Sequence, residues 1–149
     1  MKQQIFNILR VFGVCALLGT SSLSAQSSHM LIATVPFDFA VNNQHLASGT
    51  YTVTINNALS TLLIRGEENG SAMYTLTNAT EPGKVPDRGK LIFNRYGDRY
   101  FLSQVWYPEG TQGRGLPASK AEQELARNTG RPAVVALLAS GSQPHKPVR

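Results

Sequence analysis

Apolar and polar residues alternate with a period of two along most of residues 31–107, and turn-forming residues interrupt this alternation at short intervals. From Leu31 to Val41 the odd-numbered positions are apolar, whereas the even-numbered positions include Thr34 and Pro36. A period of two is that of a half-buried strand, because successive side chains point to opposite faces of a sheet. Pro36 lacks a backbone N–H, which predicts an edge strand or a bulge at that point.

The same alternation predicts further strands over residues 50–55, 59–65, 71–78, 90–95 and 99–107. Turn residues separate these segments at Asn56-Asn57, Asn69-Gly70 and Tyr96-Gly97-Asp98. Asn-Gly supplies the positive φ that tight hairpins require. Residues 79–89 hold two Pro-containing pairs and therefore predict the longest loop before the C-terminal region.

The segment 99–107 has large apolar groups on both of its predicted faces. Strict alternation places them in two sets, with Phe101, Val105 and Tyr107 on one face and Tyr100, Leu102 and Trp106 on the other. A strand that is apolar on both faces is covered from both sides. We therefore expect this strand to be central.

One helix is predicted near the C-terminus. Ser119 and Glu122 have the spacing of a capping box, in which each satisfies an N–H group of the first helical turn. Gly130 marks its end. Ala121 and Leu125 form only a narrow apolar stripe, so we expect the helix to lie across one end or edge of the sheet.

Together these elements predict an all-β fold of six or seven antiparallel strands, joined as a meander into a small barrel or a sandwich, with one short C-terminal helix. We expect a single β domain over residues 26–139 and a disordered tail over residues 140–149. The apolar run of residues 133–139 is short enough for a closing strand, although its pattern also fits a helix.

Residues 1–25 have the layout of a secretory signal peptide. Lys2 and Arg10 accompany an apolar run at residues 11–18, and small and polar residues follow up to Ala25. The apolar run is shorter than the about 20 residues of a membrane-spanning helix. We expect cleavage after residue 24 or 25, export to the periplasm or the exterior, and no stable transmembrane segment after processing.

Net charge and cysteine content argue against two classes of function, nucleic-acid binding and thiol chemistry. The formal net charge of +5 would fall to +3 when Lys2 and Arg10 leave with the leader, which is far from the concentrated charge of a dedicated nucleic-acid binder. We therefore expect no nucleic-acid partner. Cys15 is the single cysteine and lies in the leader, so the mature chain has neither a disulfide nor a thiol nucleophile.

Several segments resemble a family of small, uncharacterised exported β-rich proteins of acidobacterial type. The resemblance covers roughly residues 30–127, and the segments that carry it are Val35–Phe39, Leu46–Val53 and Gly89–Leu102 together with Trp106. It implies an exported β protein and no particular activity. The piece Gly49–Val53 also resembles segments of transthyretin-like modules.

The chain has no recognisable constellation for catalysis or cofactor binding. His29, His45 and His145 are too far apart in the sequence for a metal motif. The segment from Gly83 to Gly89-Lys90 departs from the spacing of a phosphate loop, and no G-x-S-x-G motif is present. We expect no catalytic residue, no metal and no cofactor.

Aromatic side chains are the most conspicuous candidates for binding. Tyr96, Tyr100 and Trp106 of the predicted hairpin are the residues that we expect to contact a ligand or a partner. The sequence thus favours an exported, non-enzymatic β module that binds a small apolar ligand or a protein partner. The alternatives are a secreted enzyme whose site consists of scattered polar residues, and a transthyretin-like structural or adhesion module.

Overall fold

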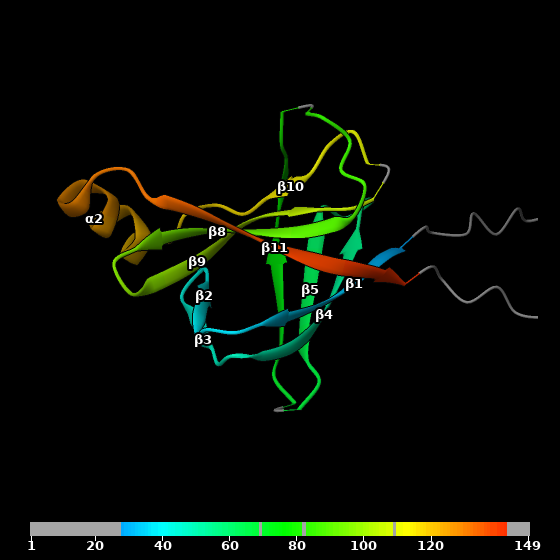
Figure 1. The fold of residues 1–149 in the computed structure, drawn as a ribbon, viewed down its shortest axis with the longest axis horizontal. Coiled ribbons are helices and arrows are strands. Elements are labelled where there is room, and N and C mark those ends of the chain that lie inside the picture. Colours follow the sequence, from blue (N-terminus) through cyan, green and yellow to red (C-terminus); the bar gives the residue numbers. More distant parts are fainter. Residues whose placement is uncertain (1–27, 69, 82, 109, 143–149) are drawn as a thin grey trace, which may run out of the picture.

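The computed structural model describes residues 28–68, 70–81, 83–108 and 110–142. In these residues it consists of one curled β-sheet and one α-helix (Figure 1). The expected all-β fold with a short C-terminal helix is confirmed. The predicted leader lies outside the described residues.

The strands vary in length from two to ten residues. They are β1 (Ser28–Val35), β2 (Phe39–Val41), β3 (Gln44–Leu46), β4 (Gly49–Asn56), β5 (Thr61–Gly66), β6 (Ala72–Leu76), β7 (Asn78–Ala79), β8 (Gly89–Tyr96), β9 (Arg99–Trp106), β10 (Arg114–Gly115) and β11 (Ala133–Ser142). Each segment predicted between residues 50 and 107 overlaps at least one of these strands. The predicted strand over residues 31–41 is divided, because β1 ends just before Pro36 and β2 begins at Phe39.

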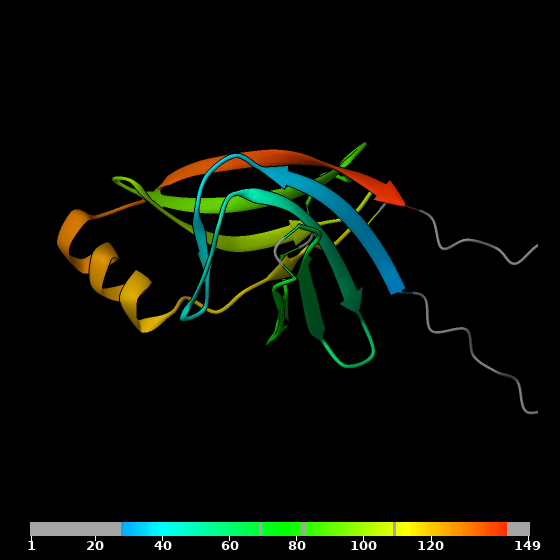
Figure 2. The same ribbon diagram turned by 90° about the horizontal axis from the view of Figure 1, so that it is seen from below.

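The strands form a single sheet in the order β3-β2-β9-β8-β11-β1-β4-β5-β6. The sheet curls into a half-barrel, as the two perpendicular views show (Figures 1 and 2). The short strand β10 pairs with β9 on one side and with β7 on the other. Because β7 follows β6 after a single residue, β10 joins β9 to the part of the chain that continues from the end strand β6.

The connections depart from a simple meander in two places. β11 pairs with both β8 and β1, so the last strand of the chain lies between the first strand and the eighth. β2 pairs with β9 in parallel. The run of residues 133–139 is thus a strand, and it extends to Ser142 because Ser140–Ser142 pair with β1. The prediction of a disordered tail over residues 140–149 is therefore wrong for residues 140–142, and residues 143–149 lie outside the described part.

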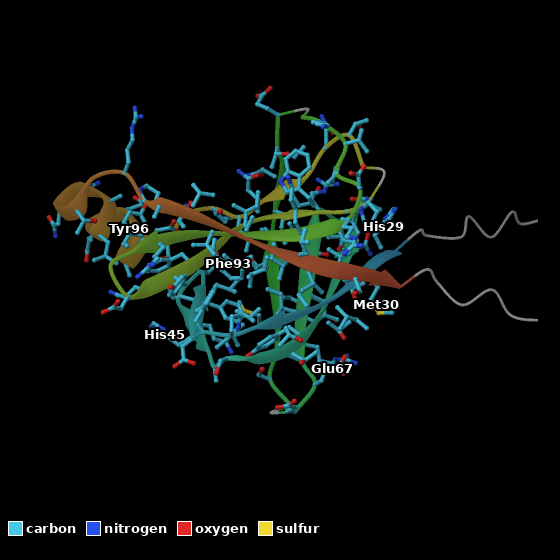
Figure 3. All side chains as sticks on the ribbon, viewed as in Figure 1. His29, Met30, His45, Glu67, Phe93 and Tyr96 are labelled. Carbon is cyan, nitrogen blue, oxygen red and sulfur yellow. The ribbon has the colours of Figure 1, made fainter. Side chains whose placement is uncertain are left out.

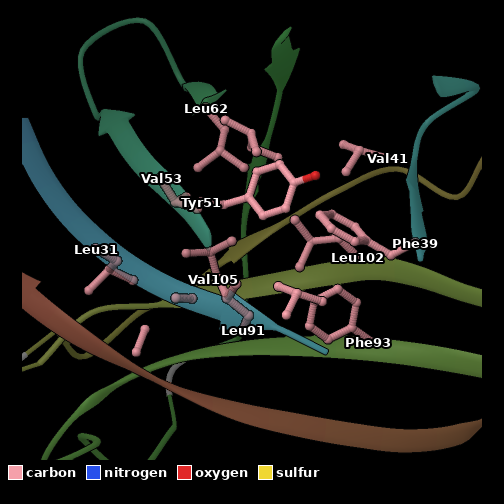
Figure 4. Close-up of a cluster of buried hydrophobic side chains, with 14 of the residues drawn as sticks. Leu31, Phe39, Val41, Tyr51, Val53, Leu62, Leu91, Phe93, Leu102 and Val105 are labelled. Atoms are coloured by element: carbon pink, nitrogen blue, oxygen red, sulfur yellow. The ribbon is translucent and has the colours of Figure 1, made fainter. Parts of the chain in front are cut away.

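The core fills the concave side of the sheet (Figure 4). Its largest members have an exposed fraction below 2 % and include Leu31, Tyr51, Ile55, Leu62, Ile64, Leu91 and Phe93. The ring of Phe39 meets those of Tyr51 and Phe93 edge to face, with centroid distances of 5.2 and 5.5 Å. These residues come from strands far apart in the sequence, so the core holds the curl of the sheet together.

A β-bulge in β9 changes which side chains face the core. Phe93 pairs with Leu102 and Ile92 pairs with Gln104, so Ser103 is an extra residue on the β9 side of the hairpin. Leu102 and Val105 consequently both join the main core. The prediction that side chains alternate strictly between the two faces of this strand is therefore wrong at the bulge.

Phe101 lies on the opposite face of β9 from Val105 and packs against Tyr96 and Ala40. Strict alternation predicts Phe101 and Val105 on one face, but the bulge places them on opposite faces. Buried side chains on both faces confirm that this strand is covered from both sides.

Helix α2 (Lys120–Thr129) lies across one end of the β8–β9 hairpin (Figures 1 and 2). Its N-cap Ser119 accepts a hydrogen bond from the backbone N–H of Glu122 at 3.1 Å. Gly130 closes it with φ of 81° and donates its N–H to the carbonyl of Ala126. No helix in the described part of the chain is long and apolar enough to cross a membrane.

Candidate functional site

The three aromatic residues predicted for binding occupy three different environments. Tyr96 is 8 % exposed and is covered by α2, with its ring 6.0 Å from that of Phe101 (Figure 3). Burial raises the pKa of Tyr96, and the carboxylate of Glu122 raises it further. This phenol is therefore a neutral part of the interface between helix and sheet.

Tyr100 is half-buried on the inner face of β9 and stacks on Phe37, with ring centroids 3.8 Å apart. Trp106 lies on the outer face, where its Nε1 donates to Oε1 of Gln104 at 2.8 Å and Lys90 Nζ lies 5.2 Å from the ring. The structure thus does not bring Tyr96, Tyr100 and Trp106 together. Their role in binding stays a prediction.

The interior of the curled sheet is occupied by side chains. Two hollows, of about 490 and 540 Å³, lie at the surface and are lined largely by exposed and half-buried residues. Among the described residues, no group of three or more His, Cys, Asp and Glu side chains is placed to hold a metal ion. The two described histidines, His29 and His45, lie far apart (Figure 3).

Glu122 is a buried carboxylate, for which the sequence predicts only a role in the helix cap. It is 5 % exposed, and its Oε1 accepts a hydrogen bond from Nδ2 of Asn94 at 2.8 Å. This bond ties the first turn of α2 to β8. Because Glu122 is buried and lines neither of the two hollows described above, we assign it a role in positioning the helix.

The free edge of β6 is the most distinctive feature of the surface. The backbone bonds from Gly66 to Ser71 and from Thr77 to Ser60 fix the ladder between β5 and β6. In an antiparallel ladder the backbone groups of alternate residues point to the partner strand. Those of Met73 and Thr75 therefore point to β5, and those of Ala72, Tyr74 and Leu76 point away from it.

On β6 two large apolar side chains face solvent, whereas a polar side chain faces the core. Tyr74 and Leu76 are 72 % and 69 % exposed, whereas Thr75 and Thr77, just beyond the strand, are 5 % and 4 % exposed. A shift of one residue would turn Tyr74 and Leu76 inward. The fold instead keeps two large apolar side chains in solvent beside a free strand edge.

Specific hydrogen bonds hold this arrangement in place. Thr75 Oγ1 accepts from Asn42 Nδ2 at 2.6 Å, and Thr77 Oγ1 donates to the carbonyl of Ser60 at 3.1 Å. Both threonine hydroxyls are thus satisfied although their side chains are buried. These hydrogen bonds remove the energetic cost of burying the threonine hydroxyls. They thereby stabilise the strand orientation in which Tyr74 and Leu76 point outward.

A surface groove runs beside this strand, and we call it the β6 edge groove. Its volume is about 540 Å³, and it is lined by Asn42, Asn43, Tyr74, Thr75, Leu76, Pro117, Ala118, Ser119 and Lys120. It lies between β6, the turn that joins β2 to β3, and the chain that enters α2. Among its described lining residues, Lys120 alone is charged.

The β6 edge could not be predicted from the sequence, because the orientation of its side chains depends on contacts between distant parts of the chain. The segment 71–78 alternates apolar and polar residues, and hydrophobicity alone would place Tyr74 and Leu76 in the core. The hydrogen bonds of Thr75 to Asn42 and of Thr77 to Ser60, which join distant parts of the chain, reveal the inverted orientation.

Comparison of the chain with known protein families, with curated proteins and with solved structures finds no match.

Proposed function

We propose that this protein is an exported, non-enzymatic β module that binds a partner protein by accepting an extended segment of that partner along the free edge of β6. The observation that carries the proposal is the exposure of Tyr74 and Leu76 on β6, whose outer edge pairs with no strand among the described residues. Strand addition of this kind takes affinity from main-chain hydrogen bonds and specificity from alternate side chains.

The β6 edge lacks the usual protection against strand pairing. Proteins commonly block an exposed edge with charged residues, with proline or with a bulge. The sequence of β6 is Ala-Met-Tyr-Thr-Leu, which contains neither charge nor proline, and its ladder with β5 is regular. An edge left open in this way favours a role in recognition.

The β6 edge groove supplies room for the side chains of a bound segment. Tyr74, Leu76 and Pro117 offer apolar contacts, and Asn42 and Asn43 offer amide groups. A peptide bound here would place alternate side chains toward the groove. We therefore expect partner segments in which apolar residues recur at every second position.

The packing of the core argues for this partner over a small ligand held inside the sheet. The core side chains of Tyr51 and Phe93 are 1 % and 0 % exposed, and both described hollows lie outside the core. An enzyme with a scattered polar site remains the alternative, and the buried Glu122 beside Asn94 is the first group to replace in testing it.

The test is selection of peptides from a displayed random library on the full chain, followed by affinity measurements with edge variants. Tyr74→Pro removes an edge N–H while leaving the ladder to β5 intact, and Leu76→Lys adds a charge at the edge. Leu138→Lys is the matched control, because Leu138 on β11 is 67 % exposed and Leu76 is 69 % exposed.

We expect both edge variants to weaken peptide binding at least tenfold and the control to bind like the original chain. Backbone amide shifts in NMR spectra should concentrate at Ala72, Tyr74 and Leu76. Selected peptides that bind both edge variants unchanged would show that the site is elsewhere.

A further inference from the structure

β11 carries a second exposed apolar surface, on the opposite side of the sheet from the core. Its inward residues Val135, Leu137 and Ala139 pack on the core. Its outward residues Val134 and Leu138 are 68 % and 67 % exposed, and Ala136 between them is exposed as well. We call these three outward residues the β11 stripe.

The side chains of the β11 stripe point out of the sheet. β8 pairs with Ala133–Ala139 along one edge of β11, and β1 pairs with Ser140–Ser142 along the other. A partner that lies on the outer face of the sheet therefore contacts the side chains of the stripe. On neighbouring strands Ile92 is the register partner of Ala136, and Ile32, which is 37 % exposed, is the partner of Ser140.

The shape and size of this surface limit what can cover it. β11 runs along the outer boundary of the molecule when seen from below (Figure 2), with the core on its other side. Small-ligand sites are concave. A stable dimer buries about 800 Å² on each partner, more than a row of three small and medium-sized side chains can supply.

Basic side chains lie at one end of the stripe. Lys90 is the register partner of Leu138 and lies on the same face. Arg88 and Leu138 line a hollow of about 490 Å³ together with Asp87, Gly89, Pro108, Ala139 and Ser140. Within the described part of the chain, the ion pair found joins Arg95 to Asp98, so neither Lys90 nor Arg88 has a salt-bridge partner there. Lys90 Nζ lies 5.2 Å from the centroid of the Trp106 ring.

We propose that the β11 stripe docks on an anionic phospholipid surface. Leu138 and Val134 enter the headgroup region of the bilayer, and the cations of Arg88 and Lys90 contact the lipid phosphates. An outward-facing row of apolar residues with adjacent cations suits such a surface, because apolar insertion and attraction to anionic lipid act together. This surface is separate from the β6 edge, so a lipid surface and a protein partner can be bound at the same time.

The test uses tryptophan as a local depth probe in the full chain. Leu138→Trp places the probe on the stripe, and Tyr74→Trp places it at a comparably exposed position on β6. Each variant is mixed with vesicles of equal parts phosphatidylglycerol and phosphatidylcholine whose acyl chains are brominated, and with brominated vesicles of phosphatidylcholine alone. Bromine quenches only a tryptophan that enters the bilayer.

We expect the fluorescence of the Leu138→Trp variant to fall on the anionic vesicles beyond the fall seen for the original chain, and that of Tyr74→Trp to match the original chain. Adding Arg88→Gln and Lys90→Gln should abolish this difference. No quenching at position 138, equal quenching at both positions, or quenching that is the same on phosphatidylcholine alone would each overturn the proposal. Because the readout is specific to the position, attachment through residues 1–25 cannot imitate the expected result.

Discussion

Asn42 and Thr75 join the two sides of the curled sheet through a hydrogen bond of 2.6 Å between Nδ2 and Oγ1. Asn42 lies in the turn between β2 and β3, and Thr75 lies on the edge strand β6, 33 residues later. The bond joins the β2–β3 turn to β6, two parts of the sheet that β10 does not pair with. It also holds Thr75 inward and so leaves its neighbours Tyr74 and Leu76 outside.

We expect Thr75→Val to lower the free energy of unfolding by about 1 kcal/mol, because the hydroxyl that serves Asn42 is lost while the shape is kept. Urea denaturation measures this effect. Thr34→Val is the control, since the hydroxyl of Thr34 on β1 shares a hydrogen bond of 3.2 Å with Thr50 at an exposed position, and its loss should change stability by less than about 0.5 kcal/mol. A Thr75→Val variant as stable as the original chain would show that the bond to Asn42 contributes nothing.

Phe101→Ala should lower the free energy of unfolding by about 3 to 5 kcal/mol, because the ring is 2 % exposed between Tyr96 and helix α2. Chemical denaturation followed by circular dichroism gives the value. Leu138→Ala, at an exposed position, serves as the comparison. A loss below about 1 kcal/mol for Phe101→Ala would place the ring at the surface and contradict the packing of α2 described above.

Gly113→Ala should destabilise the loop over Trp106. A Cβ built at Gly113 would lie 2.6 Å from a ring atom of Trp106, so the ring or the loop must move. We expect a loss of about 1 to 3 kcal/mol and a red shift of the Trp106 emission as water reaches the ring. Gly110→Ala is the matched control, because its nearest contact, the carbonyl oxygen of Tyr107, is 3.4 Å away.

The stability of the fold should fall as the pH rises above about 10. Burial raises the pKa of Tyr107 above the ordinary tyrosine value, so above pH 10 the unfolded chain loses a proton that the folded chain keeps. The unfolded state then binds fewer protons, and the free energy of unfolding decreases with pH. Tyr107→Phe should reduce this alkaline loss, as measured by urea denaturation at pH 8 and pH 11; an unchanged loss would assign it to other groups.

If the protein is exported and its leader is cleaved, the mature chain has a defined, lower mass. Protein recovered from the periplasm or the medium of a bacterial host should lack its first 24 or 25 residues, as the layout of Lys2 and the following apolar run indicates. Intact-mass spectrometry decides the point. Recovery of only the full-length chain, in the cytosol, would contradict both cleavage and export.

The hairpin of β8 and β9 and the capped helix α2 could be predicted because their signals are local. Gly97 at the turn and Ser119 at the cap act on residues within a few positions of themselves. The bulge at Ser103 carries no comparable signal. It depends on which residues of β9 best fill the core opposite Phe93, and this is a property of the assembled sheet.

The candidate site also combines features with a local sequence signal and features that depend on the assembled sheet. The sequence pointed to Tyr96, Tyr100 and Trp106 because aromatic residues cluster there, but the fold places two of them in buried packing. Tyr74 and Leu76 attracted no attention, because alternation alone does not say which face of a strand meets the core. The hydrogen bond between Asn42 and Thr75 decides this, and it joins residues that no local pattern connects.

By itself the sequence determined the β class of this protein, the positions of most strands and both ends of α2. Side-chain alternation, turn residues and helix caps act over a few residues, so they can be recognised before the chain is folded. The tertiary structure alone decided that β11 lies between β1 and β8, that the threonines of β6 face inward, and that Tyr74, Leu76, Val134 and Leu138 remain in solvent. These outcomes depend on which distant strands meet and which polar groups they satisfy, because burial is a property of the whole sheet and not of any one segment.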